Sequence, residues 1–108
     1  YSLVDNVIKF YDFETALAFT SVTPRAFSCT VPIFYDRSSN EEVKRAHECY
    51  ETLFNECIAN GYPPYRVSIN SMEKITKQNK PYWELVKTIK DSIDPQNIIS
   101  PGRYCPSN

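Results

Sequence analysis

Hydrophobic residues in the first third of the chain change from a helical spacing to a strand-like one. Residues 2–11 have apolar positions three and four apart and predict a short helix. Residues 15–22 and 27–35 are instead rich in β-branched and aromatic side chains, and Thr23-Pro24-Arg25 separates them. We therefore expect an antiparallel hairpin after the first helix.

The second strand of this hairpin has a two-residue alternation. One face is expected to carry Phe27, Cys29, Val31, Ile33 and Tyr35, and the other Ser28, Thr30, Pro32 and Phe34. Proline has no N–H to give to a strand pairing. The strand is therefore predicted to lie at a sheet edge or to bulge at Pro32.

A long amphipathic helix is predicted next. Ser39-Asn40-Glu41-Glu42 has the spacing of a capping box, and Gly61 can take the left-handed conformation that ends a helix, so the helix should run to about Asn60. Its apolar stripe comprises Val43, Ala46, His47, Tyr50, Phe54, Cys57 and Ile58. His47 lies at the edge of this stripe, and we expect it to be half-buried rather than a base or a ligand.

The last third is predicted to be helical. Residues 71–78 suggest a short helix, and Pro81 opens another that Asp94-Pro95 closes. Residues 98–103 have too few polar side chains for a solvated tail and are expected to pack on another surface. The predicted class is α+β: an antiparallel hairpin or sheet with flanking helices, followed by a helical C-terminal segment.

Composition narrows the function classes. The 108 residues suffice for one domain, and a net charge of −1 offers no basic footprint for nucleic acid. No apolar run approaches the roughly 18 residues of a membrane span, so we expect a soluble protein of the cytoplasm or periplasm. The chain begins with Tyr1 rather than Met, which fits processing or a cut from something longer. Charge divides unevenly: residues 1–65 carry five Lys/Arg and nine Asp/Glu, and residues 66–108 carry seven and four.

Cysteine and glycine usage excludes several kinds of site. Cys29, Cys49, Cys57 and Cys105 lack the close spacing of zinc or redox motifs, and there is one His, so no metal is expected. Free, mostly buried thiols are the simplest interpretation. The chain has two glycines, so it cannot hold a dinucleotide by a glycine-rich phosphate loop of its own.

The segment Gly61-Tyr62-Pro63-Pro64-Tyr65-Arg66 joins the long helix to the last third. Residue types alone leave two interpretations open. Tyr65 and Arg66 are either an ordinary core tyrosine and a surface arginine, or a phenol and a guanidinium that belong to a site. Neighbours on a regular strand point to opposite faces, so the second interpretation requires an irregular backbone, which the two prolines favour.

Two motifs resemble those of a known flavoprotein family. The run from Asp94 to Arg103, with sequence DPQNIISPGR, resembles the C-terminal signature of the vanillyl-alcohol oxidase superfamily. Arg45-Ala46-His47, Ala59-Asn60-Gly61-Tyr62 and Tyr65-Arg66 are similar to the narrower group of vanillyl-alcohol oxidase and 4-cresol methylhydroxylase, which oxidise 4-alkylphenols. The resemblance covers about residues 15–104.

This resemblance implies that the chain is part of a larger FAD-dependent enzyme. Residues 1–66 would be the C-terminal part of a cap domain that covers the flavin. Residues 67–108 would pack back on an FAD-binding domain, present in another chain or a missing segment. The isolated chain is then expected to be inactive. The resemblance leaves open the electron acceptor, oxygen or a cytochrome c, and also a homo-oligomer, the residue of any covalent flavin link and the preferred phenol.

The resemblance also implies residue roles. Tyr65 would hydrogen-bond the substrate phenolate, and Arg66 would stabilise both that phenolate and the reduced flavin. Arg103 would be a second arginine near the phenolate, and Thr30 would line the substrate cavity. Pro64 replaces a residue that varies in the family, which bears on substrate preference.

These residue types suit oxidation of a phenol. A phenolate pushes electrons into a quinone methide, which eases hydride transfer from the benzylic carbon to flavin N5. At about 4 Å and an effective dielectric near 20, one cation favours the phenolate by about 4 kcal/mol before desolvation opposes it. The alternatives are another FAD-linked oxidase, for example of a hydroxy acid, a non-catalytic small subunit that completes a partner's site, and a free-standing binding module.

Overall fold

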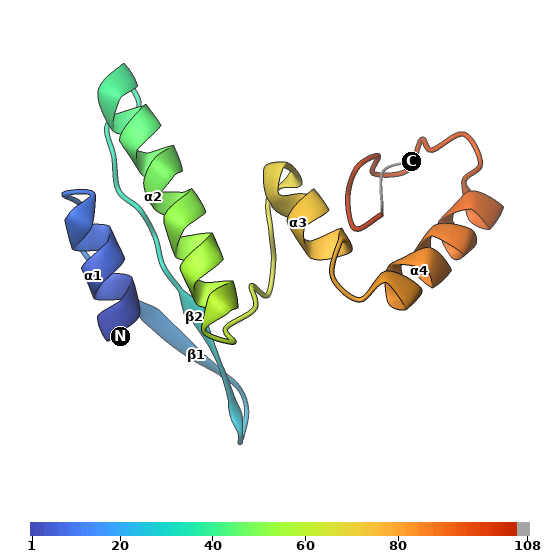
Figure 1. Cartoon of the computed structure of the whole chain (residues 1–108), viewed down its shortest axis with the longest axis horizontal. Coiled ribbons are helices and arrows are strands. Elements are labelled where there is room, and N and C mark those ends of the chain that lie inside the picture. Colours follow the sequence, from blue (N-terminus) through green and yellow to red (C-terminus); the bar gives the residue numbers. More distant parts are fainter. Residues whose placement is uncertain (106–108) are drawn as a thin grey trace. The chain divides into compact units, whose positions relative to one another are not determined.

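The computed structural model describes residues 1–105, which form two compact units. The first comprises Tyr1–Tyr65, and the second begins at Arg66. Within the described residues, the elements are four α-helices, one 3-10 helix and one two-stranded antiparallel sheet (Figure 1). The predicted α+β class is confirmed. The division lies one residue before the predicted boundary between residues 66 and 67.

The first unit pairs two helices that lie side by side, α1 (Ser2–Phe10) and α2 (Asn40–Ala59). The predicted cap of α2 forms, because the Ser39 hydroxyl accepts a hydrogen bond from the Glu42 N–H at 3.3 Å. The Glu42 carboxylate does not complete a reciprocal box. It accepts the Asp36 N–H at 2.8 Å instead and so holds the preceding loop against the helix.

The C-terminus of α2 ends in a Schellman motif at Gly61. The Tyr62 N–H donates to the Cys57 carbonyl at 2.8 Å, and the Gly61 N–H donates to the Ile58 carbonyl at 3.0 Å. Gly61 has φ +80°, the left-handed conformation predicted for it. The chain therefore leaves the helix in a defined direction just before the two prolines.

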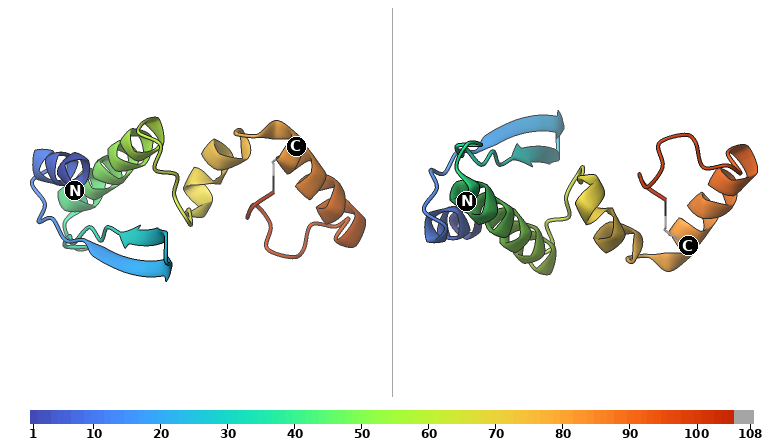
Figure 2. Two further views of the ribbon diagram at one scale, coloured as in Figure 1. Left: turned by 90° about the horizontal axis from the view of Figure 1, so that it is seen from below. Right: turned by 90° about the horizontal axis from the view of Figure 1, so that it is seen from above.

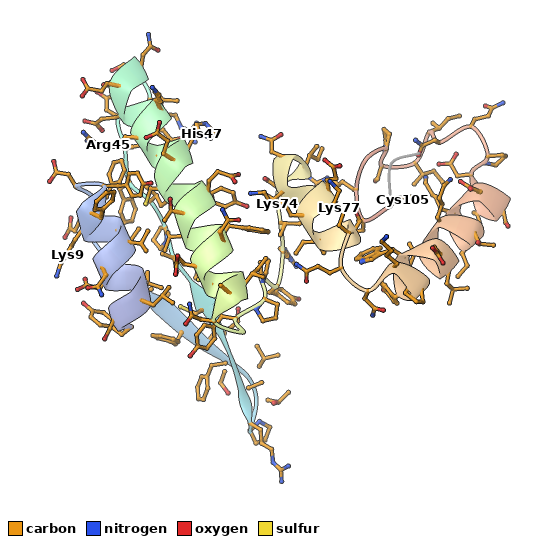
Figure 3. The ribbon with its side chains drawn as sticks, in the orientation of Figure 1. Lys9, Arg45, His47, Lys74, Lys77 and Cys105 are labelled. Atoms are coloured by element: carbon orange, nitrogen blue, oxygen red, sulfur yellow. The ribbon has the colours of Figure 1, made fainter. Side chains whose placement is uncertain are left out.

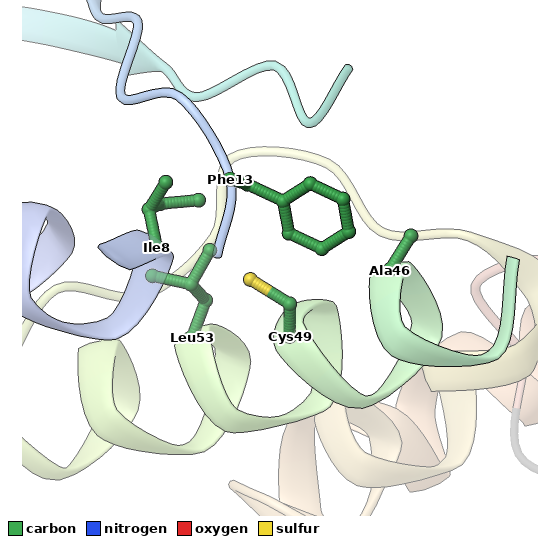
Figure 4. Close-up of a cluster of buried hydrophobic side chains, with 5 residues drawn as sticks. All are labelled: Ile8, Phe13, Ala46, Cys49 and Leu53. Atoms are coloured by element: carbon green, nitrogen blue, oxygen red, sulfur yellow. The ribbon is translucent and has the colours of Figure 1, made fainter. Parts of the chain in front are cut away.

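The core of the first unit lies between α1, α2 and the loop that follows α1 (Figure 4). Its buried side chains are Ile8, Phe13, Ala46, Cys49 and Leu53. Beside this core, the Tyr11 and Thr52 hydroxyls share a hydrogen bond at 2.7 Å. The Arg45 guanidinium lies over the Phe13 ring, 5.0 Å from its centre.

The buried stripe of α2 differs from the predicted one. Ala46 and Phe54 are buried as expected, but Cys49 and Leu53, absent from the prediction, complete the stripe because α1 packs on that side. His47 (Figure 3) is exposed, so the prediction that it is half-buried is wrong.

The hairpin is shorter than predicted. β1 (Ala18–Thr23) pairs with β2 (Ala26–Thr30). The pair extends past the ends of the two helices in Figure 1 and lies to one side of them in Figure 2. β2 ends before Pro32, because a residue without an N–H cannot continue the ladder. The residues after it pack as a loop against the core, namely Val31, Ile33 and Tyr35. The irregularity in pairing lies between Ser21 and Thr23 rather than at Pro32.

The second unit contains a 3-10 helix (Ile69–Ser71), α3 (Met72–Thr76) and α4 (Lys80–Ile93). Pro81 lies in the first turn of α4, as predicted, and the helix is capped by Asp94. No residue of α4 is buried.

The four cysteines are free, as expected, but only Cys49 is buried and Cys29 is exposed, so the prediction of mostly buried thiols is wrong.

Candidate functional site

The Tyr65-Arg66 pair lies in a bend of the chain, outside any helix or strand. Tyr65 is 79% exposed, so it is not part of the core of the first unit. Arg66 is also exposed. Tyr65 is the last residue of the first compact unit, and Arg66 is the first residue of the second.

The backbone at Tyr65 and Arg66 is a bend rather than a regular strand. On a regular strand, the two side chains would point to opposite faces. Here the Schellman motif at Gly61 sets the exit direction of the chain, and Pro63 and Pro64 fix two further φ angles before the bend. The segment is therefore irregular, as its two prolines predict, and the strand rule does not apply to it.

Arg103 lies at the end of a tight turn. Its N–H donates to the Ser100 carbonyl at 3.1 Å, and Gly102, with φ +74°, supplies the positive angle in the third position. Pro101 in the second position and glycine in the third are typical of a type II turn. The turn leaves the Arg103 side chain exposed.

A carboxylate at the end of α4 organises the loop that leads to this turn. Asp94 accepts the Ile98 N–H at 2.9 Å and the Ile99 N–H at 2.7 Å, and its third donor is the Lys90 ammonium. Lys90 Nζ also donates to the Ile99 carbonyl at 2.6 Å. Asp94 and Lys90 together therefore contact both the donor and the acceptor of the Ile99 backbone.

The contacts of Asp94 shift its ionisation. The Lys90 ammonium, and after it the Ile98 N–H, lower the pKa of the Asp94 carboxyl from 3.8 to about 2. A lowered pKa means that folding favours the ionised form. The contribution of Asp94 to stability is therefore complete above pH about 4 and is lost as the pH falls toward 2.

This linkage predicts a pH-dependent difference between the wild-type protein and an Asp94→Asn variant. At pH 5 the variant is expected to melt at a lower temperature, because it lacks the charge that attracts Lys90. As the pH falls from about 4 through 2, the two melting temperatures should converge, since the wild-type carboxyl becomes protonated around its pKa of about 2. Thermal unfolding of the full-length protein at several pH values measures this, and a difference that stays constant with pH would contradict it.

The predicted site residues come from both compact units. Thr30, at the exposed end of β2, and Tyr65 belong to the first unit, and Arg66 and Arg103 belong to the second. Within the second unit, the segment that carries Arg103 returns to α3, where the Tyr104 N–H donates to Met72 Sδ at 3.5 Å (Figure 1).

The contacts of Asp94 and Lys90 with the Ile98 and Ile99 backbone are not predicted from the sequence. The sequence marks Asp94 as a helix stop and as the first residue of a motif, and it predicts no site role for either residue. Their separation of four residues on one helix face was the available signal for an ion pair.

Among the described residues, no group of His, Cys, Asp and Glu could hold a metal ion, and no helix has the length and apolar character to cross a membrane.

Comparison with known proteins gives consistent matches. Residues 26–104 match the sequence profile described as "FAD linked oxidases, C-terminal domain". The chain is 35% identical over 92 residues to a 1'-carboxy-chondrochloren decarboxylase of Chondromyces crocatus, covering 85% of this chain and 17% of that protein. It is 36% identical over 83 residues to the flavoprotein subunit of a 4-cresol dehydrogenase [hydroxylating] of Pseudomonas putida, covering 76% of this chain and 16% of that one.

A solved structure matches as well. The crystal structure of p-cresol methylhydroxylase with substrate bound superposes with a TM-score of 0.88 at 30% identity, over 98% of this chain and 21% of that one. The chain therefore spans less than a fifth of the length of the two curated relatives.

Proposed function

This chain belongs to the C-terminal domain family of the FAD-linked oxidases, and we propose that it is part of a flavoprotein that oxidises 4-alkylphenols. The observation that carries the proposal is the exposed Tyr65-Arg66 pair on a bend. Such a pair offers a hydrogen bond and a positive charge to one phenolate oxygen. The similarity to a 4-cresol dehydrogenase subunit supports the same substrate class.

We propose that the first unit is the end of a cap domain and that the second packs on an FAD-binding domain elsewhere in the protein. The exposed apolar side chains support this assignment. In the hairpin Phe19, Val22 and Phe27 are each more than half exposed, and so are Ile89, Ile93, Ile98 and Ile99 in the second unit. Apolar surface of this extent is typical of an interaction face.

The residues of this chain fit the flavin ring of FAD but offer no glycine-rich loop for its phosphates. Both glycines are used in a helix stop and a turn, at Gly61 and Gly102, so neither belongs to a phosphate-binding loop. Arg66 and Arg103 are exposed cations that could face the flavin ring, where they would favour negative charge. FAD, when bound in the longer protein, supplies the hydride acceptor.

The proposed roles follow from the side-chain chemistry. Tyr65 donates its hydroxyl proton in a hydrogen bond to the phenolate oxygen of the substrate. Arg66 and Arg103 lower the free energy of the phenolate relative to the phenol, and thereby raise the electron density at the benzylic carbon. Thr30, exposed at the end of β2, lines the substrate cavity.

Anaerobic visible spectroscopy of the full-length flavoprotein tests the proposal. Addition of 4-ethylphenol is expected to bleach the flavin bands, whereas 4-ethylanisole, which has no ionisable hydroxyl, is expected to leave them. Equal bleaching by both compounds would contradict a role for the phenolate. Bleaching by a 2-hydroxy acid alone would favour the hydroxy-acid alternative. Reoxidation by air or by cytochrome c then identifies the electron acceptor.

A decarboxylation is the second candidate, because one relative is described as a carboxy-chondrochloren decarboxylase. The same Tyr-Arg pair would then bind a phenol that carries a carboxylated side chain. Release of CO2 from a 4-hydroxyphenyl substrate with such a side chain, with no bleaching of the flavin by 4-ethylphenol, distinguishes this candidate from the first.

A further inference from the structure

The loop between α4 and Arg103 is held by polar contacts rather than by burial of its own side chains. Ile98 and Ile99 are 70% and 63% exposed, whereas Asp94 is 7% exposed. A carboxylate so little exposed beside exposed isoleucines reverses the usual arrangement. The contacts that Asp94 makes therefore determine the shape of this loop.

The backbone of the loop needs such a constraint. Asn97 and Ser100 have φ of +52° and +46°, in the left-handed region that L-residues other than Asn and Asp seldom adopt. The Asn97 N–H donates to the Asp94 carbonyl at 2.9 Å, and the next two N–H groups donate to the carboxylate of the same residue. Residues 97–99 are thus all tied to Asp94.

The constraint extends to Arg103. Ile99 is followed at once by the turn of Ser100 to Arg103, which its own hydrogen bond closes. No flexible residue separates the atoms held by Asp94 and Lys90 from this turn. The position of the Ile99 backbone therefore sets where the turn that carries Arg103 begins.

We propose that Asp94 and Lys90 are positioning residues that place the Arg103 guanidinium for the anionic oxygen of the substrate. The inference rests on the proposed function, because it requires Arg103 to act on a phenolate. Asp94 fixes the loop through its two backbone N–H contacts. Lys90 fixes the carboxylate and the Ile99 carbonyl at the same time.

The first variant is Asp94→Asn in the full-length flavoprotein. Loss of a charge-assisted hydrogen bond raises the displaced population of a loop by about tenfold. Flavin reduction by 4-ethylphenol should therefore slow by about tenfold, and exchange of the Ile98 and Ile99 amide hydrogens should quicken by a similar factor. Asp91→Asn is the matched control, since Asp91 pairs with Lys87 four residues earlier on the same helix at 2.8 Å. The control is expected to change neither quantity.

A double-mutant cycle with Arg103→Ala separates positioning from a general structural effect. If Asp94 acts through Arg103, Asp94→Asn should have little further effect on flavin reduction once Arg103 is alanine. Equal losses in both backgrounds would overturn the inference alone. Unchanged reduction in Arg103→Ala itself would overturn the assigned role of Arg103, and the inference with it.

Lys90→Met tests the same inference if Asp94→Asn does not fold. This variant removes the ammonium and leaves both backbone N–H contacts of Asp94 in place. Lys90→Met is expected to slow flavin reduction by 4-ethylphenol less than Asp94→Asn does. In an Arg103→Ala background, Lys90→Met should not slow flavin reduction further. Lys87→Met is its control, and an identical loss in Lys87→Met and Lys90→Met would overturn the inference.

Discussion

Replacing Arg66 by alanine in the full-length flavoprotein is expected to slow reduction of the flavin by 4-ethylphenol about 100- to 1000-fold, the usual cost of removing one group that stabilises a developing anion. The guanidinium is exposed on a bend next to Tyr65, and it is proposed to act on the phenolate rather than on the fold. Melting temperature should therefore change little. Single-turnover absorbance measurements under anaerobic conditions give the rate directly.

Two further variants define what Arg66 supplies. Arg25→Ala removes another exposed arginine, at the hairpin turn, and is expected to leave the rate unchanged. Arg66→Lys keeps the charge but loses the planar fork of donors, so it should restore only part of the rate. A rate in Arg66→Ala close to that of the wild-type protein would rule out the assigned role.

Replacing Tyr65 by phenylalanine is expected to weaken binding of a 4-alkylphenol about 5- to 150-fold. This corresponds to about 1–3 kcal/mol, the cost of leaving the bound phenolate oxygen of the substrate without one hydrogen-bond partner. The ring is kept, so contacts of its faces persist and only the hydroxyl is lost. Because the side chain is 79% exposed in this chain, the substitution should leave stability almost unchanged.

The affinity can be measured from the change in the flavin spectrum as a non-reacting phenol is titrated into the full-length protein. Tyr82→Phe is a suitable control, because Tyr82 is also exposed but lies on α4 away from both motifs in sequence. An affinity in Tyr65→Phe equal to that of the wild-type protein would contradict a hydrogen bond to the substrate.

Capping and proline patterns in the sequence predicted where helices begin and end better than hydrophobic spacing predicted which side of a helix is buried. The Ser39 cap, the Gly61 stop and the position of Pro81 depend on neighbouring residues only, and the structure confirms all three. The side of α2 that is buried depends on where α1 lies. Apolar residues occur on more than one side of α2, so the pattern alone did not select the stripe that contains Cys49 and Leu53.

The candidate site was predictable only in part, for a similar reason. The Tyr65-Arg66 pair and Arg103 were found from short motifs, whose residues are contiguous. The role of Asp94 depends on an unusual backbone at Asn97 and Ser100, which brings amides four and five residues later onto its carboxylate. Residue type does not indicate such a conformation at serine.

The Lys90–Asp94 pair has a consequence for the cooperativity of the second unit. Two side chains four residues apart meet only while the turn between them is helical. Helices fray first at their ends, and a helix of 14 residues such as α4 is marginal by itself in water. Lys90 and Asp94 also bind the Ile99 backbone, so unwinding of the last turn of α4 is expected to break those contacts at the same time. Fraying of this helix end, a motion of nanoseconds to microseconds in peptides, is then expected to free the Ile99 backbone, from which the turn to Arg103 begins.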